Sequence, residues 1–570
     1  MTSVPRLFLD NRINVSDVSH TIVRVSGEQI NYFRINPDGN NFANQIVFNN
    51  VITPNLANTL VGKNIRLRYQ LQVAGTADLF LPKPVAGINE VVNGCLRAYP
   101  LQSVCDNIQL IINGSTTSVT QRQVLTALQR CQKPSLKVGT ESEGPTQADN
   151  LAVLSQAGGT NVNAQSQQVL SSYINSDGTT RGSFVASSFA ANVYTFDVVE
   201  SLMISPLTSE TDDVALPNIN TLSLQMNFSA VTDVCVWASV GGAQAVVPAS
   251  FTGVTIANPV LELTYFSVSP QLVSIPRMYQ TAYENIVYFP KALGTAVATN
   301  AASAFQVQSD TLRLTSCPSM IYIMCRPQMA LRTSAAAGAA SIADFCFPLG
   351  ANTGDGGLGY STLSMNITWG NKSGVFSSLS LQQAYKMSYK NGVKLTYKEW
   401  YNAGCILAIN PTVDIGYSPS SGDVLPGMTG SVNFQYQATY NNSNVLFAQG
   451  YAGSNAALYN AAAIPAELVI VVSYAGAAII TPDNAIFSTG ILSEAEVDML
   501  LKTAPKTGEV MSDQVLQPTV QGAGLFSSIK KIVGSVARGV GAAAPHLETA
   551  AKLAGHPLLK KIGGGVMTSA

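Results

Sequence analysis

The side chains that most often carry out chemistry in proteins are sparse in this sequence. The three histidines are His20, His546 and His556, so none lies between residues 21 and 545. A Ser–His–Asp or Cys–His catalytic site therefore cannot form in that central stretch, and neither can a zinc site that uses histidine. The cysteines show no Cys-x-x-Cys spacing; they are Cys95, Cys105, Cys131, Cys235, Cys317, Cys325, Cys346 and Cys405. We expect free thiols, no metal site and no cofactor.

Carboxylates and phosphate-binding loops give no stronger indication of catalysis. No G-x-x-x-x-G-K-[ST] loop occurs, and no G-x-G-x-x-G motif follows a predicted strand. Asp212-Asp213 and Asp355-Gly356-Gly357 stand in turn-like contexts, so a paired-carboxylate site stays open as an alternative but is not favoured. The sequence therefore predicts a protein that is not an enzyme and that has no small-molecule substrate.

The composition is unusually poor in charge. Of the 570 residues, 46% are hydrophobic and only 11% are charged, against roughly 25% charged in a typical soluble domain. A chain with so little charge often buries much of its surface in an assembly. The alternative, which composition leaves open, is an ordinary β-rich protein with a polar uncharged surface.

The few charges are unevenly distributed. Residues 521–570 contain six basic residues and one acidic residue, Glu548, so this tail carries +5 and the rest of the chain carries −6. No apolar run follows Arg6, so we expect no signal peptide and a reducing compartment for the thiols. The most apolar stretch, residues 464–480, contains Glu467 and Gly476 and predicts buried strands rather than a membrane-spanning helix.

Three segments of the first part of the chain recur later in the same order. Two of the pairs are offset by about 210 residues; the segments are 216–226 and 425–436, 259–265 and 465–471, and 108–114 and 363–369. The last pair precedes predicted helices, at 120–129 and near 379–389. Most of these segments alternate apolar and polar residues, as half-buried strands do. We therefore predict an all-β protein: two tandem antiparallel jelly rolls (a double jelly roll), with short helices and a helical C-terminal tail.

This pattern divides the chain into five parts. We expect an N-terminal arm at 1–44, a first jelly roll at 45–268 with a long polar loop at 133–187, a second jelly roll at 277–490, a short helix and linker at 491–514, and a basic amphipathic tail at 515–570. Ser493 and Glu496 form a capping-box pattern that predicts the start of the short helix. An Ala/Gly-rich loop is expected at about 334–359.

Several short motifs resemble those of a known protein family. Residues 96–101 (LRAYPL) run into 106–114 (DNIQLIING), similar to a family stretch R-x-[FY]-P-L … V-x-[IL]-N-G in which Leu110 replaces the Val. Residues 318–327, and the turn 371–374 that leads to 382–385, are also similar. The chain thus resembles the double jelly-roll major capsid proteins, above all those of Polinton-like viruses, adintoviruses and virophages.

This resemblance implies a function as well as a fold. It implies a major capsid protein whose homotrimers form pseudo-hexameric capsomers that build an icosahedral shell around DNA. It also implies contacts with neighbouring capsomers and with minor and penton capsid proteins, a place in the virion, and assembly in the host cytoplasm or nucleus. The 133–187 and 334–359 loops would project outward. The alternatives are a capsid protein of another lineage, including an RNA virus, or a carbohydrate-binding double β-sandwich protein.

The tail contains a basic amphipathic helix pattern. Its apolar positions are Leu525, Phe526, Ile529, Ile532, Val533 and Val536, and its cations are Lys530, Lys531 and Arg538. We consider three roles for it: an internal arm that contacts neighbouring capsomers or minor proteins, a membrane-binding helix, or a contact with packaged DNA.

A stretch before this helix resembles the site of the adenovirus-type maturation protease. Its residues are Val520, Gly522, Ala523 and Gly524, with Val at the first position as a departure from the pattern. The resemblance implies cleavage after Ala523.

Overall fold

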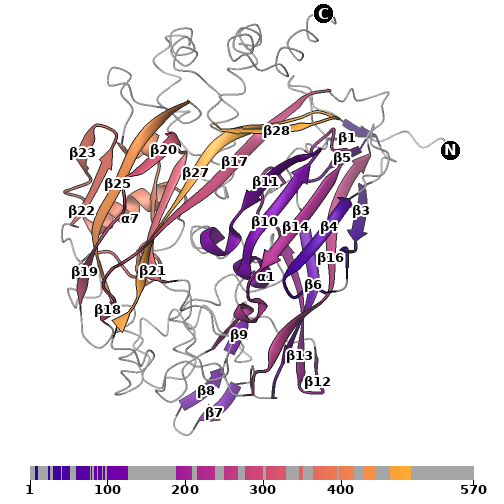
Figure 1. The fold of residues 1–570 in the computed structure, drawn as a ribbon, viewed down its shortest axis with the longest axis horizontal. Coiled ribbons are helices and arrows are strands. Elements are labelled where there is room, and N and C mark those ends of the chain that lie inside the picture. The colour runs from indigo at the N-terminus through magenta and orange to yellow at the C-terminus, as the bar shows by residue number, and fades with distance from the viewer. Residues whose placement is uncertain are drawn as a thin grey trace, which may run out of the picture.

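The computed structural model describes most of the strands and helices of two β-rich halves (Figure 1). The described residues are 7–9, 23–25, 30–39, 41–51, 59–63, 65–76, 79, 82–85, 88–92, 94–96, 99–125, 188–207, 215–237, 250–267, 277–298, 303–328, 346–350, 364–393, 397–402, 404–415, 429–442 and 463–489. The predicted tail at 515–570, the processing stretch, the short helix at 493–502 and the 133–187 loop lie outside them.

The first half is a sandwich of two antiparallel sheets. One sheet has the order β12-β13-β6-β16-β3, with β5 also paired to β16, and the other has the order β11-β10-β14-β4. The strands are β3 (Ile30–Ile35), β4 (Gln45–Val51), β5 (Thr59–Val61), β6 (Arg66–Ala74), β10 (Cys105–Ile112), β11 (Ser115–Val119), β12 (Ser188–Ala190), β13 (Val193–Ser201), β14 (Leu222–Phe228) and β16 (Gly253–Ser267).

The second half is a sandwich of the same kind. Its sheets have the orders β17-β27-β21-β24, with β28 paired to β27, and β19-β25-β22-β23, with β20 paired to β25. The strands are β17 (Tyr279–Ala292), β19 (Ala304–Gln308), β20 (Leu312–Ser316), β21 (Met320–Pro327), β22 (Met365–Trp369), β23 (Lys372–Val375), β24 (Leu407–Ile409), β25 (Thr429–Asn441), β27 (Ala466–Ile480) and β28 (Ala485–Thr489).

The two halves have one topology. When the eight main strands of each half are numbered in chain order, the two sheets have the orders 1-8-3-6 and 2-7-4-5 in both halves. This is the strand order of a jelly roll, in which two Greek keys interleave across a sandwich. The predicted all-β double jelly roll is confirmed for the described residues, while the predicted limits of each part stay predictions.

The recurring segments of the sequence fall on equivalent strands. Residues 222–226 and 432–436 lie in the seventh strands, β14 and β25; residues 259–265 and most of 465–471 lie in the eighth strands, β16 and β27. Residues 108–112 and 365–369 lie in the fourth strands, β10 and β22. A helical segment follows the fifth strand in each half: residues 121–125 in the first and α7 (Leu381–Lys390) in the second.

The start of α7 is fixed by its own residues. The Ser380 Oγ accepts a hydrogen bond from the Gln383 backbone N at 3.3 Å, and the Gln383 Oε1 accepts one from the Ser380 backbone N at 2.8 Å. This reciprocal capping satisfies two of the backbone donors that a helix N-terminus leaves unpaired. Helix α8 (Tyr397–Asn402) packs beside α7 through ring contacts of Tyr385 with Tyr397 and Trp400.

Smaller elements lie outside these sheets. The paired strands are β1 (Leu7–Leu9) with β2 (Val23–Val25), β7 (Pro82–Val85) with β8 (Ile88–Val92), β9 (Gly94–Leu96) with β15 (Cys235–Trp237), and β18 (Val297–Ala298) with β26 (Ala463–Ile464). The short helices are α1 (Pro100–Val104), η3 (Val231–Val234) and η4 (Pro411–Ile415). Within the described ranges, no helix has the length and apolar character needed to span a bilayer.

Burial differs between equivalent sheets of the two halves. In the first half, β6 alternates between buried residues and residues that are partly or fully exposed, as expected of a sheet with one face turned outward. In the second half, all eight residues of β21 and 14 of the 15 residues of β27 are buried. The second half's sheet is therefore covered on both faces.

One predicted loop departs from expectation. We expected residues 334–359 to form a projecting loop, but Cys346, Phe347, Pro348 and Leu349 are buried. Leu349 forms a β-bridge with Tyr440, and the Phe347 backbone N donates to the Cys325 carbonyl O at 2.7 Å. This short segment is part of the core because its backbone pairs with two buried strands.

Gly476 provides a test of the long strand β27. A Cβ at this position would lie 2.0 Å from the Ser488 carbonyl O in β28, which no real Cβ tolerates. We expect Gly476→Ala to lower the free energy of unfolding by about 1–3 kcal/mol, because the β27–β28 pair must separate to make room. Urea unfolding measures this effect. Gly294→Ala, with nothing within 4 Å of its Cβ, is the control, and an equal loss in both variants would contradict the close approach.

Candidate functional site

The two halves meet along a polar and apolar interface, which is the candidate functional site of this chain. In Figure 1 the halves stand side by side, and β17, β27 and β28 of the second half extend toward β11 of the first. The Thr117 and Tyr283 hydroxyls are hydrogen-bonded at 2.9 Å, and the Lys63 Nζ donates to the Thr281 Oγ1 at 3.0 Å. Strand β17 is therefore held directly by side chains of the first half.

The Asn113-Gly114 turn ties one end of this interface together. Asn113 (φ 47°) and Gly114 (φ 83°) both have the left-handed backbone of a two-residue hairpin turn between β10 and β11. The Asn113 Oδ1 accepts from the backbone N of Asn220 and Thr221, and its Nδ2 donates to the Asn218 and Thr481 carbonyls, both at 2.7 Å. One side chain thus joins its own half to the β27–β28 turn of the other.

The neighbouring side chains repeat this connection. The Asn220 Nδ2 donates to the Pro482 carbonyl O at 2.5 Å, and the Ser115 hydroxyl contacts Asn484 at 3.0 Å and also donates to the Ala485 carbonyl O. All of these partners are uncharged. The turn at 481–484 is therefore clasped by a set of neutral hydrogen bonds.

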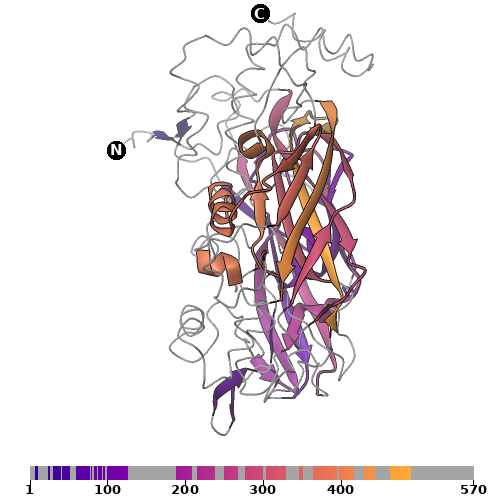
Figure 2. The same ribbon diagram turned by 90° about the vertical axis from the view of Figure 1, so that its left-hand side faces the viewer.

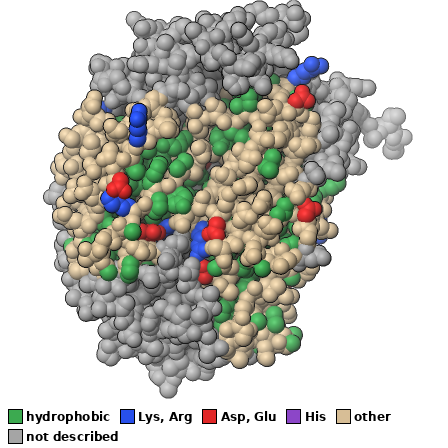
Figure 3. Space-filling view, viewed as in Figure 1, with side chains coloured by type: hydrophobic (Ala, Val, Ile, Leu, Met, Phe, Trp, Pro, Cys, Tyr) green, Lys and Arg blue, Asp and Glu red, His purple; other side chains and the backbone are tan. Residues whose placement is uncertain are grey.

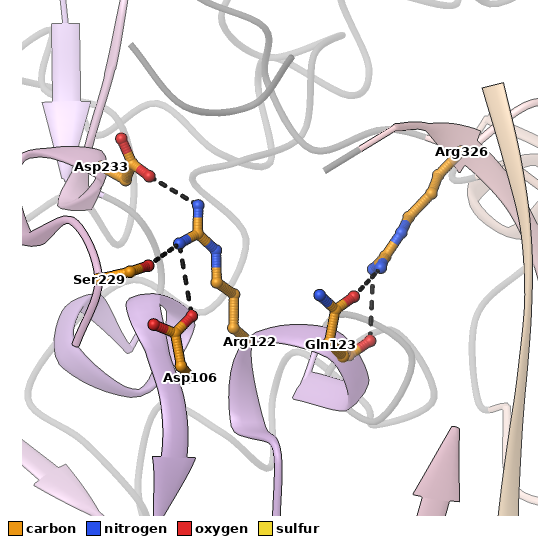
Figure 4. Close-up of polar contacts among 6 residues, drawn as sticks. All are labelled: Asp106, Arg122, Gln123, Ser229, Asp233 and Arg326. Carbon is orange, nitrogen blue, oxygen red and sulfur yellow. Dashed lines mark hydrogen bonds and ion pairs between the residues drawn. The ribbon is translucent and has the colours of Figure 1, made fainter. Parts of the chain in front are cut away.

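A buried arginine joins the halves at a second place (Figure 4). The Arg326 Nε donates to the Glu467 Oε1 at 2.8 Å, and its Nη2 and Nη1 donate to the Gln123 Oε1 at 2.5 Å and to the Gln123 carbonyl O at 3.3 Å. The Arg326 side chain is only 2% exposed. Because Gln123 belongs to the first half, it completes the coordination of a charge that is buried in the second.

The residue before Gln123 is Arg122, which contacts groups of its own half. The Arg122 Nη2 forms an ion pair with the Asp233 Oδ2 at 2.6 Å, and its Nη1 lies 3.1 Å from the Ser229 Oγ and 3.6 Å from the Asp106 Oδ1. Figure 4 shows the partners of these two adjacent residues on opposite sides, with Asp233 and Ser229 on one side and Arg326 on the other. Arg122 anchors the helical segment 121–125 in its own half, so Gln123 is presented to the other half at a fixed position.

A buried carboxylate explains the Tyr-Pro-Leu motif. The Glu200 Oε1 accepts from the Leu101 backbone N at 2.9 Å and from the Tyr69 hydroxyl. Its Oε2 accepts from the Gln102 backbone N and Nε2. Burial raises the pKa of the Glu200 carboxyl, and these hydrogen bonds partly counter that rise. The Glu200 carboxylate therefore holds Leu101 and Gln102 in place in the first sandwich, which is a structural role.

Sequence reasoning singled out a few residues for chemistry, for processing and for contacts of the tail. Asp212-Asp213, Asp355-Gly356-Gly357, the processing residues Val520 and Gly522–Gly524, and the tail residues 525–538 all lie outside the described ranges. Six cysteines have described side chains, all of them buried, and they form no disulfide with one another: Cys105, Cys235, Cys317, Cys325, Cys346 and Cys405. Among the described residues, no group of three or more His, Cys, Asp or Glu side chains is placed to hold a metal ion.

Sequence reasoning missed the residues that join the halves. Arg326 and Asn113 lie inside motifs that we singled out, but only as marks of resemblance. The sequence did contain a signal for such a contact. Arg326 and Glu467 are each the single charged residue of a strand that is otherwise almost entirely apolar. A charge at such a position usually requires a buried partner.

Comparison with known proteins extends these findings. A family model described as the Sputnik virophage major capsid protein 1st domain matches residues 6–269, and one described as the major capsid protein V20 C-terminal domain matches residues 288–403. Together they span about two thirds of the chain. The chain belongs to the virophage-type major capsid protein family. The recognition made from the sequence motifs is thereby confirmed.

Individual relatives of this major capsid protein agree. The putative capsid protein V20 of Sputnik virophage is 22% identical over 558 residues, which cover 92% of this chain and 85% of the relative. Two solved structures share the fold: that of the Sputnik virophage by cryo-EM (TM-score 0.61, 17% identity, 86% of this chain and 94% of that one) and the mavirus major capsid protein (TM-score 0.55, 16%, 83% and 92%). These relatives are structural capsid proteins and not enzymes.

The buried charge pair gives a prediction about the interface of this capsid protein. Arg326→Leu leaves the Glu467 carboxylate buried without its partner, so we expect a loss of about 3–5 kcal/mol of stability. Arg326→Leu combined with Glu467→Leu removes both charges and is expected to recover most of that loss. Urea unfolding of the two variants measures the difference.

The exposed ion pair of Lys291 and Asp310 is the control for this test. The Lys291 side chain is 38% exposed and the Asp310 side chain 72% exposed. Lys291→Leu is expected to change stability by less than about 1 kcal/mol, because water screens such pairs. A double variant no more stable than Arg326→Leu alone would contradict the account of Arg326.

Proposed function

We propose that three copies of this chain close into a ring of six jelly rolls, a pseudo-hexameric capsomer, and that such capsomers build an icosahedral shell around viral DNA. The observation that carries the proposal is the contact between the halves, in which two like domains use unlike surfaces. The first half presents β11 and residues 121–125, and the second half receives them with β17, β21 and the β27–β28 turn. Such a head-to-tail contact generates a ring when it repeats and closes.

Among the described residues, each chain then has one receiving face that its own halves leave unused. This receiving face is the outward face of β6, β13 and β16 in the first half, and it corresponds to the covered face of β21 and β27 in the second. It carries Arg68, Asp197, Thr255 and Asn258, all exposed. Gln70 links two of them, because its Nε2 donates to the Asp197 Oδ1 at 2.9 Å and its Oε1 accepts from the Asn258 Nδ2 at 3.1 Å.

Among the described residues, each chain also has one unused presenting side, which is the side of the second half that corresponds to β11 and residues 121–125 of the first. It consists of β23 and α7 of the second half, which follow one another as β11 and residues 121–125 do in the first. Gln383 stands three residues after Ser380, as Gln123 stands three residues after Thr120. Figure 2 shows α7 and α8 standing off one side of the strands, and Tyr389 of α7 is 41% exposed. We infer that this side docks on the receiving face of the next copy.

The scarcity of charge fits burial on both sides of each sandwich. Figure 3 shows a face dominated by uncharged and hydrophobic side chains, with only scattered charged groups. Uncharged amides and hydroxyls, such as those of Gln70, Thr255 and Asn258 on the receiving face, are buried at lower cost than ions. The charged groups named on that face are Arg68 and Asp197. A ring interface made largely of such groups can therefore form without the desolvation of many charges.

The description of a relative as a capsid protein supports a place in the virion. A putative capsid protein of Sputnik virophage is the relative described above, so we propose that this chain resides in a virion and is assembled in the host cytoplasm or nucleus. We further propose contacts with neighbouring capsomers and with minor and penton capsid proteins. The tail at 515–570 is proposed as an internal arm for such contacts; binding to membrane or to DNA are the competing proposals.

A substitution on the receiving face tests the ring. We expect the full-length chain to elute with three chain masses in size-exclusion chromatography with multi-angle light scattering. Thr255→Arg places a charge in the proposed contact between copies, so we expect the trimer to dissociate at protein concentrations at least about tenfold higher than the wild type. Its unfolding free energy as a monomer is expected to stay within about 0.5 kcal/mol of the wild-type value, because Thr255 is exposed within one chain.

Gln308→Arg is the matched control for this substitution. Gln308 is an exposed polar residue of β19, the edge strand on the opposite side of its sheet from β23. It is expected to leave the trimer intact. A wild-type chain that stays monomeric at high concentration, or equal dissociation of both variants, would overturn the proposed ring.

A further inference from the structure

Glu284 is a carboxylic acid buried at the junction of the two halves with only part of its hydrogen bonds made. It lies in β17 and is 3% exposed. Its backbone N donates to the Ser205 Oγ of the first half at 2.9 Å, and its Oε1 accepts a hydrogen bond from the Ser473 hydroxyl in β27. Its Oε2 is buried and has no hydrogen-bond partner among the described residues.

The groups around Glu284 are neutral. Ser473 is its donor, and the Ser319 hydroxyl is bonded to the Ser473 carbonyl O at 3.0 Å and lies 3.3 Å from its Oγ. The first-half segment that contains Ser205, residues 202–207, has no ionisable side chain. On the strands packed around it, β27, β21 and β28, the charged residues are Glu467 and Arg326, which pair with each other.

The other ionisable residues of these strands are Tyr322, Cys325 and Tyr474, none of which is a cation. Further ionisable groups lie on β17 itself or face it from the first half. Tyr283 is bonded to Thr117, and Lys63 is bonded to Thr281, three residues before Glu284. No cation is therefore shown within contact of the carboxyl group. Desolvation raises the pKa of Glu284 to about 7, and the hydrogen bond from Ser473 opposes that rise.

We propose that Glu284 makes the contact between the two halves sensitive to protons: the neutral acid holds the halves closed, and the ionised form loosens them. The proposal rests on the geometry within one chain and does not require the trimeric ring. When the halves separate locally, the carboxyl group reaches water and its pKa returns toward the ordinary value of 4.5. The closed contact therefore binds the proton more tightly than the open one, so its stability falls as pH rises from about 4.5 to about 7 and is level above that range.

Hydrogen exchange of the full-length protein tests this inference. Exchange of the backbone amides in 279–285 and 203–207 is compared between the wild type and Glu284→Gln at pH 5 and at pH 8. Glutamine keeps the shape and cannot ionise, so we expect the two proteins to exchange within about fivefold of each other at pH 5. At pH 8 we expect the wild type to exchange faster by a factor on the order of ten or more, as a shift of this size implies. Comparison at one pH cancels the intrinsic dependence of exchange on pH, and it cancels the contribution of buried Glu200, which both proteins share.

Two further variants keep the test decisive. Asp310→Asn removes an exposed carboxylate of the second half, 72% exposed, and is expected to match the wild type at both pH values. If Glu284→Gln does not fold, Ser473→Ala serves instead: it removes the donor that favours the ionised form, so the excess opening at pH 8 over pH 5 should grow. A ratio between wild type and Glu284→Gln that is the same at pH 5 and pH 8, or no growth in Ser473→Ala, would overturn the proposal.

Discussion

The fold depends on one constraint, which is that the eight-residue β21 and nearly all of β27 must be kept from water on both faces. A strand in a two-layer sandwich normally buries only every second residue, and β6 of the first half does so. One face of β21 and β27 is covered by the second half's own sandwich. The other lies toward the first half, where Arg326 reaches Gln123 (Figure 4). The two jelly rolls are therefore one hydrophobic unit, as their shared core cluster shows.

This constraint explains why the interface contains charged groups at all. Burying Arg326 and Glu467 costs much desolvation energy, which their attraction and the bonds to Gln123 offset only when all three groups are in place. Such a pair contributes more to the choice of docking position than to net stability. The segment that supplies Gln123 is held in turn by the ion pair of Arg122 with Asp233. Arg122 and Gln123, which are adjacent in the chain, thus fix the position of one sandwich relative to the other.

Much of the fold was predictable from the sequence because local patterns decide it. Alternation of apolar and polar residues marks β10 and β14, and a helical segment follows the fifth strand in both halves. The order of these patterns, repeated along the chain, was sufficient to predict tandem jelly rolls.

The interface was not predictable, because its partners are far apart in the sequence. Arg326 meets a residue 203 positions away, and no local spacing announces that contact. Composition also misled in one place: residues 346–350 follow an Ala/Gly-rich stretch that suggests a loop, yet their backbone joins Cys325 and Tyr440. Burial there is set by pairing with distant strands rather than by the residues themselves.

The hydrogen bonds around Asn113 determine how the interface between the halves responds to salt. Its bonds to Asn218, Asn220, Thr221 and Thr481 join amide groups and carbonyls and involve no net charge. Dissolved ions screen attraction between charges over about 8–10 Å, but they have little effect on short neutral hydrogen bonds. The angle between the two jelly rolls at this end is therefore expected to be the same in dilute and in concentrated salt.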